Sequence, residues 1–131
     1  MDVPAWRLDI DDSTGALHQR AAFVAYLKAC RAVGDYAAAE IIFGEIVANA
    51  MIHAPGPIAV TVEWLDGHAL LHVFDAGLPL DAARVSGVAD PFDEHGRGLA
   101  IVKGLSPELT VDNGYSSGKT VSAELPVRRG A

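Results

Sequence analysis

The chain contains a single cysteine, Cys30, among its 131 residues. One thiol cannot close an internal disulfide, so a disulfide framework is excluded, and we expect Cys30 to be a small buried apolar side chain in a helical segment. The N-terminus lacks a basic segment followed by an apolar run, and no window has the length of a membrane-spanning helix. These absences predict a cytoplasmic protein with no membrane partner.

Basic residues are also scarce. The 10 lysine and arginine residues are outnumbered by 17 aspartate and glutamate residues, which gives a formal net charge of -7 and a pI near 5.0. This balance argues against nucleic acid as the main partner. Hydrophobic residues make up 50% of the sequence and charged residues 21%, as in folded proteins, and the length predicts one domain over residues 1–131.

Periodicity and turn signals predict the order of helices and strands. Alternating apolar residues predict strands at 6–10, 58–65, 68–74, 109–112 and 120–125. Asp66-Gly67 is a strong hairpin signal between the second and third of these strands. Helices are predicted from the possible caps at 11–14 to about 33, from Tyr36 after its cap Asp35 to about 54, and at 99–105.

Strands in hairpin pairs with helices grouped between them predict a two-layer α/β sandwich. Its sheet would be mixed or antiparallel and would carry the helices on one face. Residues 78–95 show no clear period and predict a long loop, which in a compact domain usually has a function.

The second predicted helix carries polar residues at a regular spacing. Glu45, Asn49 and His53 recur every four residues, which aligns a carboxylate, an amide and an imidazole along one ridge of an otherwise apolar helix. A carboxylate and an amide oxygen one turn apart can hold a hydroxyl group and a hard cation side by side, as phosphate chemistry with Mg²⁺ requires. A solvated helix stripe has the same pattern, so this ridge alone does not decide the function.

Two later segments add to this ridge. Asp75-Ala76-Gly77 ends a predicted strand, where a fixed carboxylate can accept a hydrogen bond from an exocyclic amino group, although ordinary turns have the same residues. Residues 95–99, His-Gly-Arg-Gly-Leu, form a glycine-rich segment that opens a helix, and such a helix start binds anions. Each signal is weak by itself.

In this order, and followed by Gly118-Lys119-Thr120-Val121 before the last strand, these segments resemble the GHKL ATP-binding fold. That fold, also called the Bergerat fold, is shared by gyrase, Hsp90, MutL and histidine kinases. The resemblance is greatest to the small anti-sigma-factor serine kinases, in which the segment typically reads Gly-Arg-Gly-Leu-x-Ile-Val, as at residues 96–102 here. It covers residues 17–126 and implies the Bergerat type of two-layer sandwich.

The resemblance also implies a role for each matching residue. Glu45 would be the general base toward the acceptor hydroxyl, and Asn49 would coordinate Mg²⁺. Asp75 would bind the adenine amino group of ATP, with Thr120 supporting the carboxylate and Gly77 leaving room for the base. His53 would hold the helix end.

The phosphate side of the site is implied in the same way. Gly96, Gly98 and the backbone at Leu99 would cradle the phosphates, with Arg97 as a further phosphate contact, and residues 78–95 would form a lid. Pro79 stands where many relatives carry glycine and would stiffen that lid. Lys103 and Lys119 are expected to be structural or surface residues.

As a function, the resemblance implies a serine/threonine protein kinase of the partner-switching type. Such a kinase holds a sigma factor or similar client and phosphorylates a small antagonist protein, commonly as a homodimer. One alternative is a non-catalytic module in which ATP binding gates a partner; an intact Glu45 disfavours it and Pro79 favours it. Another is a stand-alone histidine-kinase-like ATPase domain, whose acceptor histidine a partner protein would supply. Roles like those of gyrase, MutL and Hsp90 are disfavoured because those proteins use a following domain.

Overall fold

The structure is a computed structural model that describes residues 6–10, 16–53, 57–77, 94–113 and 118–130. For residues 16, 17, 53 and 94–98 it describes the backbone alone. The predicted lid, including Pro79, lies outside the described residues apart from the start of the last helix.

Three helices form the described helical layer. They are α1 (Ala16–Ala29), α2 (Tyr36–His53) and α4 (Glu94–Leu105). α2 begins where the sequence predicts, because the Asp35 carboxylate accepts a hydrogen bond from the backbone N–H of Ala38 at 3.0 Å and so satisfies one of the free amides of the first turn. α1 ends at Ala29, earlier than predicted, because Arg31 takes the left-handed conformation (φ 58°) that terminates a helix.

Six strands form one sheet, and neighbouring strands in the described part of the chain pair antiparallel. They are β1 (Trp6–Ile10), β2 (Val33–Gly34), β3 (Ile58–Leu65), β4 (His68–Asp75), β5 (Thr110–Asp112) and β6 (Lys119–Arg128). The sheet order is β1-β3-β4-β6-β2, with β5 also paired to β6. Asp66 (φ 52°) and Gly67 (φ 81°) turn the β3–β4 hairpin, as Asp-Gly predicts.

The short strand β2 is absent from the sequence-based prediction, which extended the first helix to about residue 33. Val33 and Gly34 instead pair with Arg128 and Val127 at the end of β6, and β6 is longer than predicted for the same reason. Gly34 has φ 140°, and a Cβ there would lie 2.4 Å from the Pro126 carbonyl oxygen. Two residues are too few for a periodic signal, so this strand depends on its tertiary contact.

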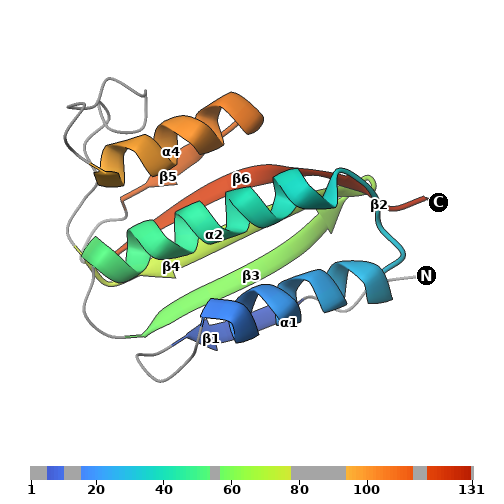
Figure 1. Ribbon diagram of the computed structural model, residues 1–131, viewed down its shortest axis with the longest axis horizontal. Helices are drawn as coiled ribbons and strands as arrows, with labels where there is room; N and C mark the ends of the chain where they lie inside the picture. Colours follow the sequence, from blue (N-terminus) through green and yellow to red (C-terminus); the bar gives the residue numbers. More distant parts are fainter. Residues whose placement is uncertain (1–5, 11–15, 54–56, 78–93, 114–117, 131) are drawn as a thin grey trace.

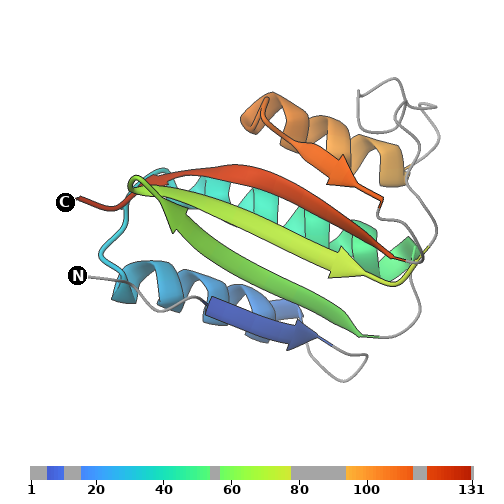
Figure 2. The same cartoon turned by 180° about the vertical axis from the view of Figure 1, so that it is seen from behind.

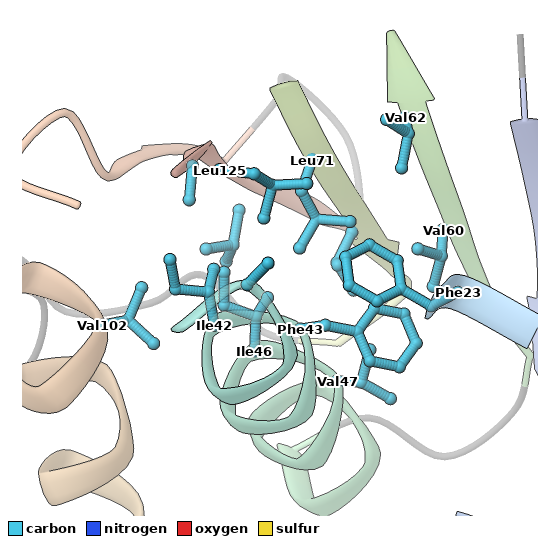
Figure 3. Close-up of a cluster of buried hydrophobic side chains, with 14 of the residues drawn as sticks. Phe23, Ile42, Phe43, Ile46, Val47, Val60, Val62, Leu71, Val102 and Leu125 are labelled. Carbon is cyan, nitrogen blue, oxygen red and sulfur yellow. The ribbon is translucent and has the colours of Figure 1, made fainter. Parts of the chain in front are cut away.

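The helices and the sheet form two layers, as expected. Figure 1 shows the three helices in front of the sheet, and Figure 2 shows the sheet from its other face with the helices behind it. Side chains from all three helices and from the sheet meet in one buried cluster (Figure 3). Phe23 of α1 and Phe43 of α2 stack in it, with ring centroids 4.4 Å apart. The two-layer α/β sandwich predicted from the sequence is therefore confirmed.

Candidate nucleotide site

The predicted site residues come from elements that gather at one end of the molecule. The last turn of α2, the end of β4, the start of β6 and the start of α4 lie together on the left of Figure 1 and on the right of Figure 2. This arrangement follows from the topology, because β4 ends where its antiparallel partner β6 begins. Residues distant in sequence, among them Asp75 and Lys119, are thus brought to one region.

Asp75 is the most buried of these residues, with 0% of its surface exposed. Its Oδ1 atom accepts two hydrogen bonds, from the backbone N–H of Gly77 and from the Nζ atom of Lys119, both at 2.8 Å. Within the part of the chain that the structure describes, its Oδ2 atom has no hydrogen-bond partner. A buried carboxylate oxygen without a donor is costly in a finished fold, so this atom indicates a place for a ligand donor.

Lys119, rather than Thr120, supports the Asp75 carboxylate. Lys119 is the cross-strand partner of Asp75, whereas Thr120 is the partner of Phe74. Because side chains alternate along a strand, Thr120 and the 42% exposed Phe74 face the other side of the sheet. The prediction that Thr120 supports the Asp75 carboxylate is therefore corrected: the register of β4 and β6 places Lys119 in that position.

Alternation along β6 was the signal for this role of Lys119. Counting back in steps of two from the buried apolar residues of the strand leads to Lys119, which is 2% exposed. These residues are Val121, Ala123, Leu125 and Val127. Lys119 was expected to be a structural or surface residue. A buried lysine is rare without a paired charge, and its pair with Asp75 becomes visible only when the strands are placed in register.

Gly118 allows the start of β6 to approach Asp75 closely. It has φ 93°, and a Cβ at this position would lie 2.8 Å from both the Asp75 carbonyl oxygen and the Phe74 ring. Glycine is therefore required for conformation and for space. Gly77 contributes through its backbone N–H, which holds the carboxylate in a fixed orientation.

α2 carries the other two described polar residues of the site. Asn49 is 4% exposed, and its Nδ2 atom has no hydrogen-bond partner among the described residues. Glu45, one turn earlier, is half-buried and thus partly accessible to solvent. The predicted ridge therefore lies at the boundary between the core and solvent. The side chain of His53, at the end of α2, lies outside the described part of the chain.

The glycine-rich segment differs from the expectation in one respect. α4 begins at Glu94, so Gly96 lies in its first turn and Gly98 and Leu99 follow inside the helix. The free amides of a helix belong to its first residues, and later amides are bonded within the helix. A phosphate cradle that uses the amides of Gly98 and Leu99 therefore requires the start of α4 to unwind. The Leu99 side chain is 0% exposed in the core, and that of Arg97 lies outside the described side chains.

The rest of the described chain has a groove but neither a metal-binding cluster nor a membrane-spanning helix. They contain no group of three or more His, Cys, Asp or Glu side chains that could hold a metal ion by themselves. In the same part of the chain, no helix has the length and apolar character needed to cross a membrane. A groove of about 400 Å³ lies between β2, β6 and the residues after α4, and neither Asp75 nor Lys119 lines it.

The described geometry therefore combines a buried acceptor at Asp75 with polar groups on α2 and a helix start. This combination can hold a planar base with an amino group beside a polar, anionic chain. Comparison with known proteins agrees with it: residues 34–129 match the model of the histidine kinase-, DNA gyrase B- and HSP90-like ATPases. The chain belongs to this ATPase family. The match includes α2, Asp75, the glycine-rich segment and Lys119.

Solved structures similar to this member of the ATPase family include two histidine kinases. Full-length ShkA in complex with AMPPNP is 25% identical with a TM-score of 0.60, and the match covers 74% of this chain and 23% of ShkA. The nucleotide-free catalytic domain of histidine kinase ThkA is 14% identical with a TM-score of 0.59, and the match covers 92% of this chain and 95% of that domain. No curated protein matches the chain by sequence.

Proposed function

We propose that this chain is an ATP-dependent serine/threonine protein kinase that acts as an anti-sigma factor in partner switching. It would hold a sigma factor or similar client and phosphorylate a small antagonist protein, with a homodimer as its working form. The observation that supports ATP as the substrate is the buried Asp75 carboxylate, whose Oδ2 atom has no partner among the described residues. An adenine amino group is a donor of the kind that this atom lacks.

The α2 ridge supports transfer rather than binding alone. Glu45 is half-buried, so it can reach solvent and accept the proton of an acceptor hydroxyl group. The acceptor oxygen would attack the γ-phosphorus of ATP, the bond to the bridging oxygen would break, and ADP would leave. A module that merely binds nucleotide needs no base at this position.

Asn49 is the proposed ligand of Mg²⁺. Its amide is buried beside the end of α2, and its Nδ2 atom lacks a partner among the described residues, so the side chain can turn its oxygen toward a cation. The cation would neutralise phosphate charge when bound. Magnesium sites at nucleotides use one or two protein ligands together with phosphate oxygens and water, so one amide fits this demand.

The first experiment measures ATP binding with Mg²⁺ by calorimetry and then transfer of labelled phosphate to candidate antagonist proteins. We expect wild type to bind, Asp75→Asn to lose binding, and Glu45→Gln to bind but not to transfer. Glu40→Gln on the same helix is the matched control, because five residues rotate it away from the Glu45 ridge. If wild type does not bind ATP, the proposal fails.

A histidine-kinase-like ATPase domain is the second candidate, favoured by the similarity to ShkA and to the ThkA catalytic domain. A partner would then supply the acceptor histidine. The chemistry of the product separates the two candidates, because phosphoserine survives acid and is lost in alkali, whereas phosphohistidine shows the reverse. An acid-labile, alkali-stable product on the acceptor would replace the serine/threonine assignment with the histidine one.

A further inference from the structure

Among the described residues, the ammonium group of Lys119 has more hydrogen-bond donors than its bond to Asp75 uses. It carries three N–H donors and no acceptor. In the described part of the chain, one of these donors is seen on Asp75 Oδ1, at 2.8 Å. The side chains of Lys119 and Asp75 are each 1% exposed, so the remaining donors are shielded from bulk water. A shielded ammonium with spare donors is strongly favoured to bind an acceptor.

The two side chains together present a donor next to an acceptor. Oδ2 of Asp75 accepts and has no partner among the described residues, and the spare N–H groups of Lys119 donate. Adenine offers a complementary edge: its exocyclic N6 amino group donates, and the ring nitrogen N1 beside it carries a lone pair that accepts. Both partners can therefore be satisfied at once by one base.

We propose that Lys119 donates a hydrogen bond to N1 of the adenine base while Asp75 accepts one from N6. This inference rests on the proposed function, since it concerns how the same site selects its nucleotide. It makes Lys119 a base-contacting residue in addition to the counter-charge of Asp75.

The proposal has a direct consequence for specificity. In the same pose, guanine and hypoxanthine place O6, an acceptor, against the Asp75 carboxylate and N1–H, a donor, against the Lys119 ammonium. Both pairs are then mismatched, and neither side chain can reverse its role, because an ammonium has no acceptor and a carboxylate has no donor. The pair therefore selects adenine over guanine without further contacts.

The test compares ATP with 1-deaza-ATP, in which N1 is replaced by C–H, by calorimetry on wild type and on Lys119→Met. 7-Deaza-ATP is the matched control, because it carries the same kind of change at the opposite edge of the base. In wild type we expect 1-deaza-ATP to bind about tenfold or more weakly than ATP, as for loss of a hydrogen bond from a charged donor. 7-Deaza-ATP should bind nearly as well as ATP. In Lys119→Met the difference between ATP and 1-deaza-ATP should disappear.

Each outcome has one meaning. If 1-deaza-ATP suffers no loss in wild type, or the same loss in Lys119→Met as in wild type, Lys119 does not contact N1 and the inference is overturned. Failure of wild type to bind ATP at all would instead overturn the proposed function, which separates the two.

A second measurement needs no variant, in case Lys119→Met does not fold. In wild type bound to ATP, the adenine proton on C2 lies next to N1, so it should show a nuclear Overhauser effect to the terminal methylene protons of Lys119. Absence of this effect in the ATP-saturated protein would overturn the inference by itself.

Discussion

Asp75 and Lys119 are direct cross-strand partners of β4 and β6, and their carboxylate and ammonium groups meet at 2.8 Å with 1% of each side chain exposed. The main charge of the candidate site is thus compensated inside the protein. A buried pair of this kind contributes little compared with an apolar pair of similar volume, but removing one partner leaves an uncompensated charge. Stability and the proposed recognition of the base therefore depend on the same contact.

Lys119→Met should lower the free energy of unfolding by about 3–5 kcal/mol, because the buried Asp75 carboxylate loses its counter-charge. The double substitution Asp75→Leu with Lys119→Met should recover most of that loss, since no charge remains buried. Denaturant titration measures both. Lys103→Met on α4 is the control, because Lys103 is only half-buried and should change stability little. A single-variant loss below about 1 kcal/mol would contradict the pairing.

Gly118→Ala and Gly104→Ala should shift stability in opposite directions. At Gly118, the new Cβ would lie 2.8 Å from the Asp75 carbonyl oxygen, and φ is 93°, so we expect a loss of at least about 1–2 kcal/mol. At Gly104 in α4, nothing lies within 4 Å of the new Cβ, and alanine should stabilise the helix by about 0.5–1 kcal/mol. Thermal unfolding of both variants measures whether each substitution lowers or raises stability. Equal effects would show that Gly118 is not required for conformation or space.

Tyr26 should make stability depend on alkaline pH. Burial raises the pKa of Tyr26 from 10.0 to about 12, while the hydrogen bond from Trp64 Nε1 to its oxygen, at 2.9 Å, lowers it. Because the folded pKa is the higher one, the contribution to stability is complete below pH 10.0 and is lost as the pH rises to about 12.

The change of unfolding free energy with pH, measured across this window, tests the Tyr26 prediction. Tyr26→Phe should show a shallower decline with pH than wild type. Tyrosinate absorbance of the folded protein should show a late-titrating component that disappears in Tyr26→Phe. A parallel decline in wild type and in Tyr26→Phe would contradict the assignment.

Asp35→Ala should weaken the start of α2. The Asp35 carboxylate accepts the Ala38 N–H at 3.0 Å, and loss of such a cap costs about 1 kcal/mol. Asp35→Asn keeps an accepting oxygen at the same place and should retain most of the stability. Chemical denaturation of the three proteins measures the difference, and an Asp35→Asn loss as large as that of Asp35→Ala would show that the cap is not the cause.

Local signals predicted most of the fold. The cap Asp35 and the turn Asp66-Gly67 act over a few residues, so the bounds of α2 and of the β3–β4 hairpin could be predicted from the sequence. The strand β2 could not, because Val33 and Gly34 are extended through their pairing with β6 rather than through any pattern of their own. The early end of α1 at Ala29 was not predicted either, because Arg31 takes a left-handed conformation (φ 58°) that usually favours glycine.

For the candidate site, the sequence pointed to residues whose burial the structure describes, and less clearly to how they contact one another. Asp75 and Asn49 were named from their motifs, and both are buried with a polar atom that lacks a partner among the described residues. The role predicted for Thr120 but taken by Lys119 shows the limit of prediction from a motif. A motif identifies a segment, but the choice between adjacent residues depends on which face of the strand each occupies, and the register with β4 decides that.

Because of this register, the Asp75–Lys119 pair also favours the correct pairing of β4 with β6. A slip of one residue between β4 and β6 would turn Lys119 toward solvent and leave the Asp75 carboxylate in the apolar layer without a cation. Misaligned sheets are therefore penalised by an isolated buried charge, whereas a sheet held by apolar residues alone would tolerate them better. In this protein, the correct alignment of β4 and β6 therefore also brings the Asp75–Lys119 pair of the candidate site together.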